Sequence, residues 1–383
     1  MRFDPLHQNP EYTFAQKLTH VPWGLVLVVC GLAAIGCTML YSAASGAWDP
    51  WAQDQAVRFG AGFLGLLAVA LIDVRVWFRW AWVVYALAVG MLVATQVAGV
   101  MGQGAQRWID LGVIQLQPSE LMKVALVLAL ARYFHGLSDE EVGRPLRLIA
   151  PLVATAVPVG LVIQQPDLGT GLILLMLAGA VFFAAGVSLW MFGAVLGAGL
   201  AAIPIAWQFL HQYQKERVLT FLNPQNDPLG EGYHILQSKI ALGAGGMFGK
   251  GFLEGTQSHL NFLPEKQTDF IFTMLAEEFG MVGGLALLGL YALVLVYGLA
   301  IAMRAHNHFG RLLALGLTAN VFLYVFLNIA MVMGVIPVVG VPLPLISYGG
   351  TAMLAVLGTL GLVMSVHVHR DVRIPRRGLN DDA

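Results

Sequence analysis

The chain has 383 residues, of which 58% are hydrophobic and only 11% are charged. A soluble domain carries about 25% charged residues, so this composition excludes a soluble protein and predicts a polytopic membrane protein. The formal net charge of −1 gives no basis for nucleic-acid binding.

Ten apolar runs have the length that a membrane-spanning helix needs, roughly 17–25 residues. They lie near 21–45, 56–72, 79–98, 118–135, 147–163, 170–187, 189–210, 271–303, 312–334 and 348–369. The first run is too long for the apolar core of a secretory signal peptide. The sequence therefore predicts an all-α polytopic integral membrane protein, with residues 1–383 forming a single membrane domain.

Basic residues are distributed unequally between the two sets of connections. If residues 1–20 lie inside, the short inner segments hold thirteen Lys and Arg side chains and the short outer segments hold only three. Positive charge marks the cytoplasmic side of a membrane protein. We therefore expect both termini, including the tail 370–383, to be cytoplasmic.

The segment 211–270, between the seventh and eighth spans, is long and is predicted to lie outside. Its central part alternates polar and apolar residues at helical spacing, which predicts an interfacial helix on the outer leaflet. The glycine-rich GAGGMFGKG that follows is not a phosphate-binding loop. Ala244 occupies the place of the first glycine, and Gly251 follows Lys250 where Ser or Thr is needed.

Two polar clusters lie near the outer ends of the spans. Glu120 and Lys123 can pair on one helix face, either as an ion pair at the helix start or as part of a site. Trp108 suits the aromatic belt of a membrane interface. Asp167, between the fifth and sixth spans, either caps the sixth span or contributes to a site.

The stretch FLPEKQTDFIFTMLAEEFG, residues 262–280, places carboxylates at a bilayer boundary, where ionisable groups are functional by default. Asp269, Glu277 and Glu278 indicate acid/base or cation chemistry; the alternative is that Thr268 or Asp269 caps the helix that follows. The long loop also carries several cations. Cations can bind phosphates while a carboxylate accepts a hydroxyl proton, as a pyrophosphate-bearing substrate needs. These cations are Arg217, Lys239, Lys250 and Lys266.

The segment 341–354, VPLPLISYGGTAML, contains two prolines that prevent a regular helix. Its Ser-Tyr-Gly-Gly sequence, which begins at Ser347, bends the chain. This pattern predicts a re-entrant loop that joins the ninth and tenth spans. The histidines have no metal-ligand spacing, so the sequence assigns no metal-site residues.

Taken together, these motifs resemble the SEDS family of bacterial cell-envelope polymerases. Those that carry the resemblance are RWIDLGVIQLQPSELMK, QPDLGTG, FLNPQNDPLGEGYHILQSKIALGAGGMFGKG, GTQSHLNFLPEKQTDFIF with AEEFG, and PLPLISYGGTAML. They occur in order over nearly the whole chain. The segments 342–345 and 276–278 are more similar to elongation-type than to division-type members. Gln267 stands where the family usually has His, which weakens any role for an imidazole beside the base.

The resemblance implies a peptidoglycan glycosyltransferase of the bacterial cytoplasmic (inner) membrane, which polymerises lipid II into β-1,4 glycan strands on the outer face during cell elongation. It implies Asp269 as the general base and undecaprenyl pyrophosphate as the leaving group. The expected substrate-binding residues are Arg217, Lys239, Lys123, Glu120, Asp167 and Gln257. The expected supporting residues are Trp108, Glu277, Glu278 and Ser347. A divalent cation, Mg²⁺ or Mn²⁺, is left open as a helper, and no organic cofactor is implied.

The resemblance also implies a partner, a class B penicillin-binding protein with a single spanning helix. We expect it to dock near the eighth and ninth spans, where small residues such as Gly289 and Gly316 permit close helix approach. Three alternatives to this function remain: a lipid II flippase, which needs a polar path to the inner side; a scaffold of an envelope machine, which would not need Asp269; and the division-type homologue.

Overall fold

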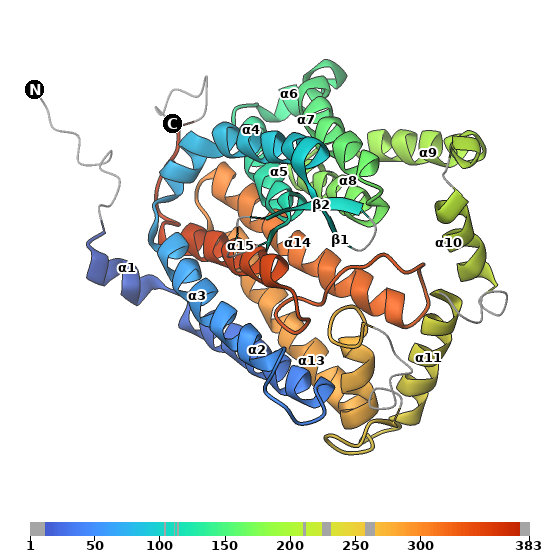
Figure 1. Cartoon of the computed structure of the whole chain (residues 1–383). Coiled ribbons are helices and arrows are strands. Elements are labelled where there is room, and N and C mark those ends of the chain that lie inside the picture. The colour runs from blue at the N-terminus through green and yellow to red at the C-terminus, as the bar shows by residue number, and fades with distance from the viewer. Residues whose placement is uncertain are drawn as a thin grey trace, which may run out of the picture.

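The computed structural model describes residues 12–102, 105–110, 112, 115–209, 212–223, 231–256 and 265–375. Ten long helices match the ten predicted spans, which confirms the all-α membrane fold (Figure 1). They are α2 (Trp23–Ala43), α3 (Ala52–Leu71), α4 (Val74–Ala98), α5 (Pro118–His135), α7 (Pro145–Gln164), α8 (Leu168–Ala184), α9 (Leu189–Phe209), α13 (Ile271–Arg304), α14 (His308–Val332) and α15 (Gly350–Val368). Within the described ranges, seven of the ten are long and apolar enough to cross a membrane by themselves.

Local sequence signals set where several of these helices begin. Pro118 and Pro145 occupy first-turn positions, where a missing backbone N–H costs nothing. Asp73 accepts a hydrogen bond from the backbone of Arg75, and Asn307 accepts one from Gly310 at 2.6 Å. These caps explain why α4 and α14 begin before the apolar runs that predict them.

The helices α14 and α15 lie at the centre of the bundle. Their apolar windows are 72% and 78% buried, against 22% for α3 and α4, whose apolar side chains face outward as expected for contact with lipid. Gly316 of α14 packs between Val127 of α5 and Val181 of α8, since an added Cβ atom would come within 2.6 and 2.8 Å of them. The expectation that Gly316 faces a partner is therefore wrong; this glycine is needed inside the bundle.

One end of the bundle, here the termini face, carries the short helix α1 (Phe14–His20), the short helix α6 (Asp139–Val142) and the last described residues (Figure 1). The Tyr12 hydroxyl bonds Asp371 at 3.1 Å, and the amide of His306 bonds the carbonyl of Arg370. Val372 is fully buried beneath these contacts. The two ends of the described chain thus lie on the same face, as an even number of spans requires.

The opposite end, here the cavity face, carries a small sheet that the sequence did not predict. It consists of β1 (Val100–Gly102), β2 (Ala105–Asp110) and β3 (Gln115–Leu116), antiparallel in the order β1-β2-β3. These strands are too short to show a clear alternation of side chains. They place the segment around Trp108 over the ends of the neighbouring spans.

The long loop contains two helices, α10 (Gln212–Leu222) and α11 (Glu231–Ala244), which confirms its expected helical part. In Figure 1, α9 extends sideways from α7 and α8, and α10 and α11 continue from it along one flank. The side chains of α9 are exposed along most of its length, including Trp190 at 65% and Leu196 at 65%. Since α9 is apolar, this exposed surface suits lipid.

Candidate functional site

A polar cavity of about 320 Å³ opens at the cavity face, among β2, α5, α8, the segment before α13, α14 and the segment 338–352. It brings together side chains that are far apart in the sequence. Those that the sequence predicts for the site and that line the cavity are Trp108, Glu120, Lys123, Asp167 and Asp269. The segment around Ser347, which the sequence predicts to be re-entrant, supplies neighbouring walls of the same cavity.

Asp269 lies in the turn that precedes α13. This helix begins at Ile271 after an N-cap residue, Phe270, that forms no side-chain cap bond. The alternative that Thr268 or Asp269 caps the helix is therefore wrong. The carboxylate lines the cavity beside Gly340, where Oδ2 would lie 3.7 Å from an added Cβ atom. The carboxylate of Asp269 therefore faces a cavity and not a helix end.

Three consecutive carbonyl groups fix this turn. The carbonyl of Gln267 accepts from the amide of Tyr348 at 2.8 Å, and that of Thr268 accepts from Ser347 Oγ at 2.6 Å. The carbonyl of Asp269 accepts from Asn328 Nδ2 at 3.0 Å. The re-entrant segment and α14 therefore hold the backbone of Asp269 in one position, as a positioned base needs.

Asn328 is a positioning residue that the sequence did not reveal. It is fully buried on α14, and its Nδ2 also donates to the carbonyl of Val341 at 2.7 Å. One amide group thus joins the turn of Asp269 to the re-entrant segment. The available signal was an amide within a long apolar span, where a polar side chain needs a partner.

Glu120, Lys123 and Tyr324 form a buried cluster in the cavity wall. Lys123 Nζ donates to Glu120 Oε1 at 2.8 Å, which confirms the predicted pair. The Tyr324 hydroxyl donates to the other oxygen of Glu120 and accepts from Lys123, whose Nζ lies 4.2 Å from the tyrosine ring centroid. Lys123 is therefore a cation held inside the wall, in the second turn of α5, and not in a connection between spans.

Asp167 has the capping role that one prediction gave it, and it also lines the cavity. Its carboxylate accepts from the amide of Thr170 at 3.1 Å and from the Thr170 hydroxyl at 2.9 Å. Arg107 of β2 lies 3.8 Å away and donates to the carbonyls of Gln165 and Pro166. Arg107 thus ties the small sheet to the turn between α7 and α8.

Glu277 and Glu278 do not line the cavity. Glu277 is fully buried and accepts from Lys250 Nζ at 2.8 Å and from the Thr256 hydroxyl at 3.1 Å. Glu278 accepts from Ser42 Oγ of α2 at 2.5 Å. These two carboxylates hold parts of the chain together away from the cavity.

Both carboxylates stand next to a break in α13. Gly280 has φ +68 and ψ −163, so the helical hydrogen bonds stop there. The glycine-rich segment 245–251 replaces them: the amides of Lys250 and Gly251 donate to the carbonyls of Glu277 and Glu278, and the amides of Met281 and Val282 donate back to this segment. The glycines of the segment 245–251 therefore serve close backbone packing.

Of the remaining predicted residues, Lys239 is described and does not line the cavity. Lys239 is exposed on α11, with its Nζ 2.7 Å from the position of a Cβ added at Gly334. The side chain of Arg217 and the whole of Gln257 lie outside the described part of the chain. Lys266 is buried three residues before Asp269, and this burial lowers the pKa of its ammonium group.

No group of three His, Cys, Asp or Glu side chains in the described ranges could hold a metal ion together. Glu120 is paired with Lys123, and Asp167 is bound to Thr170. The described residues therefore do not fit a metal centre. A divalent cation stays a prediction.

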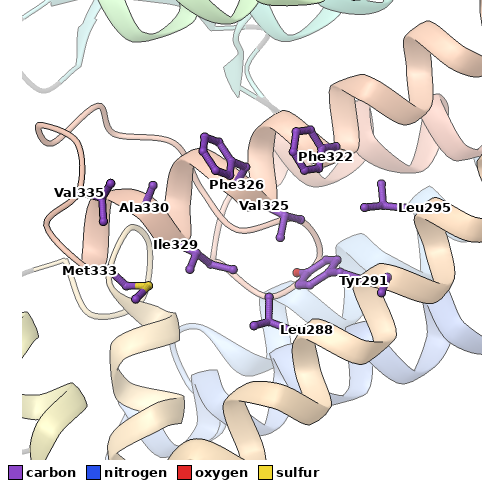
Figure 2. Close-up of a pocket in the computed structure, with 11 residues that line it drawn as sticks. Leu288, Tyr291, Leu295, Phe322, Val325, Phe326, Ile329, Ala330, Met333 and Val335 are labelled. Carbon is purple, nitrogen blue, oxygen red and sulfur yellow. The ribbon is translucent and has the colours of Figure 1, made fainter.

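A second, apolar groove of about 340 Å³ lies between α13 and α14 (Figure 2). Tyr291 and Leu288 of α13 face Val325 and Ile329 of α14 across it, and Met333 and Val335 close one end. Its lining is almost entirely apolar, so its chemistry differs from that of the cavity.

Comparisons with known proteins agree with this fold. The family model FTSW_RODA_SPOVE, described as "Cell cycle protein", matches residues 22–372. The chain is 44% identical to peptidoglycan glycosyltransferase MrdB of Escherichia coli K12, over 94% of this chain and 97% of that one. It is 36% identical to a probable peptidoglycan glycosyltransferase FtsW of Trichlorobacter lovleyi, over 89% of this chain and 92% of that one.

Solved structures show the same architecture. A chain from a peptidoglycan synthase complex that coordinates polymerisation and crosslinking superposes with a TM-score of 0.80 at 35% identity, over 91% of this chain and 98% of that one. The rod shape determining protein RodA of Thermus thermophilus superposes with a TM-score of 0.69 at 31% identity, over 91% and 97%.

Proposed function

Because the chain belongs to the SEDS family, we propose that it is a peptidoglycan glycosyltransferase that polymerises lipid II into β-1,4 glycan strands. The observation that carries the proposal is the position of Asp269. Its carboxylate lines a polar cavity, and three backbone contacts fix the turn that presents it. The similarity to MrdB favours the elongation-type function over the division-type alternative.

The proposed reaction is a single displacement. Asp269 accepts the proton of the acceptor sugar's 4-hydroxyl while that oxygen forms a bond to the anomeric carbon of the donor. The bond from this carbon to the pyrophosphate oxygen breaks, and undecaprenyl pyrophosphate leaves with the electron pair. A positioned general base contributes about 10²–10⁴-fold to such a step, and the fixed turn supplies the positioning.

Lys123 and its partners shape the electric field of the cavity. The lysine is 1% exposed and bonded to Glu120 and Tyr324, so its charge has a fixed place in the wall. A fixed cation in the cavity wall favours the negative charge that develops on the leaving group. Because the charge is already paired, we assign Lys123 an electrostatic role and not direct capture of phosphate.

The cavity face is proposed to be extracytoplasmic, in the cytoplasmic (inner) membrane of a bacterium. The excess of Lys and Arg in the connections on the other side supports this orientation. A flippase would need a polar path to the termini face. There Phe78 packs edge-on against His135 at 5.2 Å and Phe309 at 5.1 Å between ring centroids. This aromatic layer argues against the flippase alternative.

The groove between α13 and α14 is proposed to receive the single spanning helix of a class B penicillin-binding protein. It is apolar, and ten of the side chains that line it are labelled in Figure 2. Gly289 of α13 is not in its lining, but it is exposed and has no atom within 4 Å of an added Cβ atom. The superposed chain from a peptidoglycan synthase complex supports a cross-linking partner. Since α13 follows directly from Asp269, a helix in the groove could influence the turn that carries the base.

A substitution tests this docking surface. Ala292→Trp fills the groove, and Ala86→Trp, at an exposed position of α4, is the matched control. We expect Ala292→Trp to weaken co-purification of the partner and Ala86→Trp to leave it intact. Equal co-purification with both variants would place the partner elsewhere.

The experiment that tests the enzymatic function is polymerisation of purified lipid II by the purified protein, with and without the Asp269 carboxylate. We expect glycan strands from the wild type and at least about a 100-fold lower rate from Asp269→Ala. Failure of the folded wild-type protein to polymerise lipid II, with the partner present, would contradict the proposal.

A further inference from the structure

The first turn of α15 opens into the cavity. Gly349, Thr351 and Ala352 line it, and the N-cap residue Gly349 forms no side-chain cap bond. The helical hydrogen bonds begin with the amide of Met353, which donates to the carbonyl of Gly349. Among the described residues, the preceding amides of Gly350, Thr351 and Ala352 find no acceptor. They are the unsatisfied donors of a helix start, a kind of position that commonly binds anions.

Thr351 adds an independent observation. It is only 5% exposed, lines the cavity, and its hydroxyl has no hydrogen-bond partner in the described part of the protein. The hydroxyl of Thr359 on the same helix instead donates to the carbonyl four residues earlier, at 2.8 Å. For Thr351 that carbonyl belongs to Ser347 and already accepts from Gln55 at 3.1 Å. Thr351 is thus a largely buried side chain that lines the cavity and has no partner for its hydroxyl among the described residues, so this group can bond to a ligand in the cavity.

Three carboxylates (Glu120, Asp167 and Asp269) and two cations line the cavity among the described residues, so a positive field at this helix end must come from outside the lining. The two cations that line the cavity, Lys123 and Arg107, already face Glu120 and Asp167. Behind the helix start, Arg58 lies with Nη1 3.4 Å from the position of a Cβ added at Gly350, and its guanidinium stacks on Tyr348. Arg58 also pairs with the exposed Asp54 at 3.2 Å. The helix dipole and Arg58 together make this end electropositive.

We propose that the first turn of α15, with the Thr351 hydroxyl, binds the diphosphate of the polyprenyl-linked donor. This inference rests on the proposed function and adds the place of the leaving group. The amide of Tyr348 is bonded to the turn of Asp269, so α15 begins next to the element that carries the base. The base and the leaving group then occupy the same cavity, with the reacting sugar between them.

Equilibrium binding of undecaprenyl pyrophosphate to the purified protein in detergent micelles tests the proposal. Thr351→Val keeps the shape and removes the hydroxyl, so we expect binding to weaken at least about tenfold. Thr351→Asp places a negative charge at the site and should abolish binding. Thr351→Ser should bind within about threefold of the wild type, and Thr359→Val, on the same helix but with its hydroxyl satisfied internally, should bind like the wild type.

Inorganic pyrophosphate serves as the second probe and separates a lipid headgroup from a free anion. We expect inorganic pyrophosphate to compete weakly with the lipid for the wild-type protein. It should no longer compete for Thr351→Asp, because the added carboxylate repels it. Wild-type lipid affinity in folded Thr351→Val and Thr351→Asp would overturn the proposal. The proposal would also be overturned if these substitutions weakened the binding of inorganic pyrophosphate but left the binding of the lipid unchanged.

The Asp269→Asn variant separates this inference from the proposed function. It should bind undecaprenyl pyrophosphate normally while it fails to polymerise lipid II. If the wild type binds the lipid through Thr351 but never makes glycan, the function fails and the anion site stands. If Asp269→Asn stops polymerisation but Thr351→Asp binds normally, the function stands and the anion site fails.

Discussion

Asp269 and the Glu277–Glu278 pair lie eight residues apart in one motif, yet the structure places them in different environments. Asp269 faces a polar cavity from a turn that its neighbours hold by backbone contacts. Glu277 and Glu278 are 0% and 1% exposed and bonded to Lys250 and Ser42. A carboxylate at a membrane boundary is therefore not in itself evidence of chemistry. Access to a cavity distinguishes the base from the structural acids.

The difference comes from the backbone. The turn before α13 leaves Asp269 outside the helix, whereas Glu277 and Glu278 belong to its first turns, just before the break at Gly280. There the glycine-rich segment supplies the hydrogen bonds that the helix lacks. We expect changes at the break to affect folding and changes at the turn to affect the rate.

The largest effect is expected at the break itself. In Gly280→Val, the Cβ atom would lie 2.3 Å from the amide nitrogen of Gly249, and the φ of +68 disfavours any side chain. We expect this variant to yield no monodisperse protein in size-exclusion chromatography. Gly289→Val, on the same helix in open space, is the control and should behave like the wild type. A folded Gly280→Val protein would show that the break is not required.

The buried pair in the cavity wall should give the next largest effect. Removing one partner, as in Lys123→Met or Glu120→Gln, should reduce the free energy of unfolding by about 3 kcal/mol, because a charge is left unpaired. The double variant should be more stable than either single variant, since neither charge remains. Thermal unfolding in detergent measures this. Additive losses in the double variant would contradict the coupling and indicate separate roles.

A smaller effect, measured on the rate of folded protein, is expected from Asn328. Asn328→Leu removes the donor to the carbonyl of Asp269, so kcat should fall about tenfold with little change in KM. Asn320→Leu, at another buried amide on α14, should keep kcat. Steady-state kinetics on lipid II distinguishes the two. A change in KM alone for Asn328→Leu would indicate substrate contact instead of positioning.

The sequence predicted the ten spans because long apolar runs with capping residues at their starts have few other structures open to them. It also placed Asp269 and the Glu120–Lys123 pair in one site, through local spacing and the family resemblance. It could not separate Asp269 from Glu277, since burial depends on packing against the segment 245–251. Nor could it find Asn328, Tyr324 or Thr351, whose roles arise from contacts between distant segments.

The comparison between the two kinds of carboxylate is tested most directly by the initial rates of lipid II polymerisation for Asp269→Asn and Glu277→Gln, measured side by side on folded protein. Both substitutions remove one charge and keep the side-chain size. We predict at least about a 100-fold loss for Asp269→Asn and a loss within about threefold for Glu277→Gln. Near-normal polymerisation by Asp269→Asn, or an equal loss in folded Glu277→Gln, would contradict the assignment of the base.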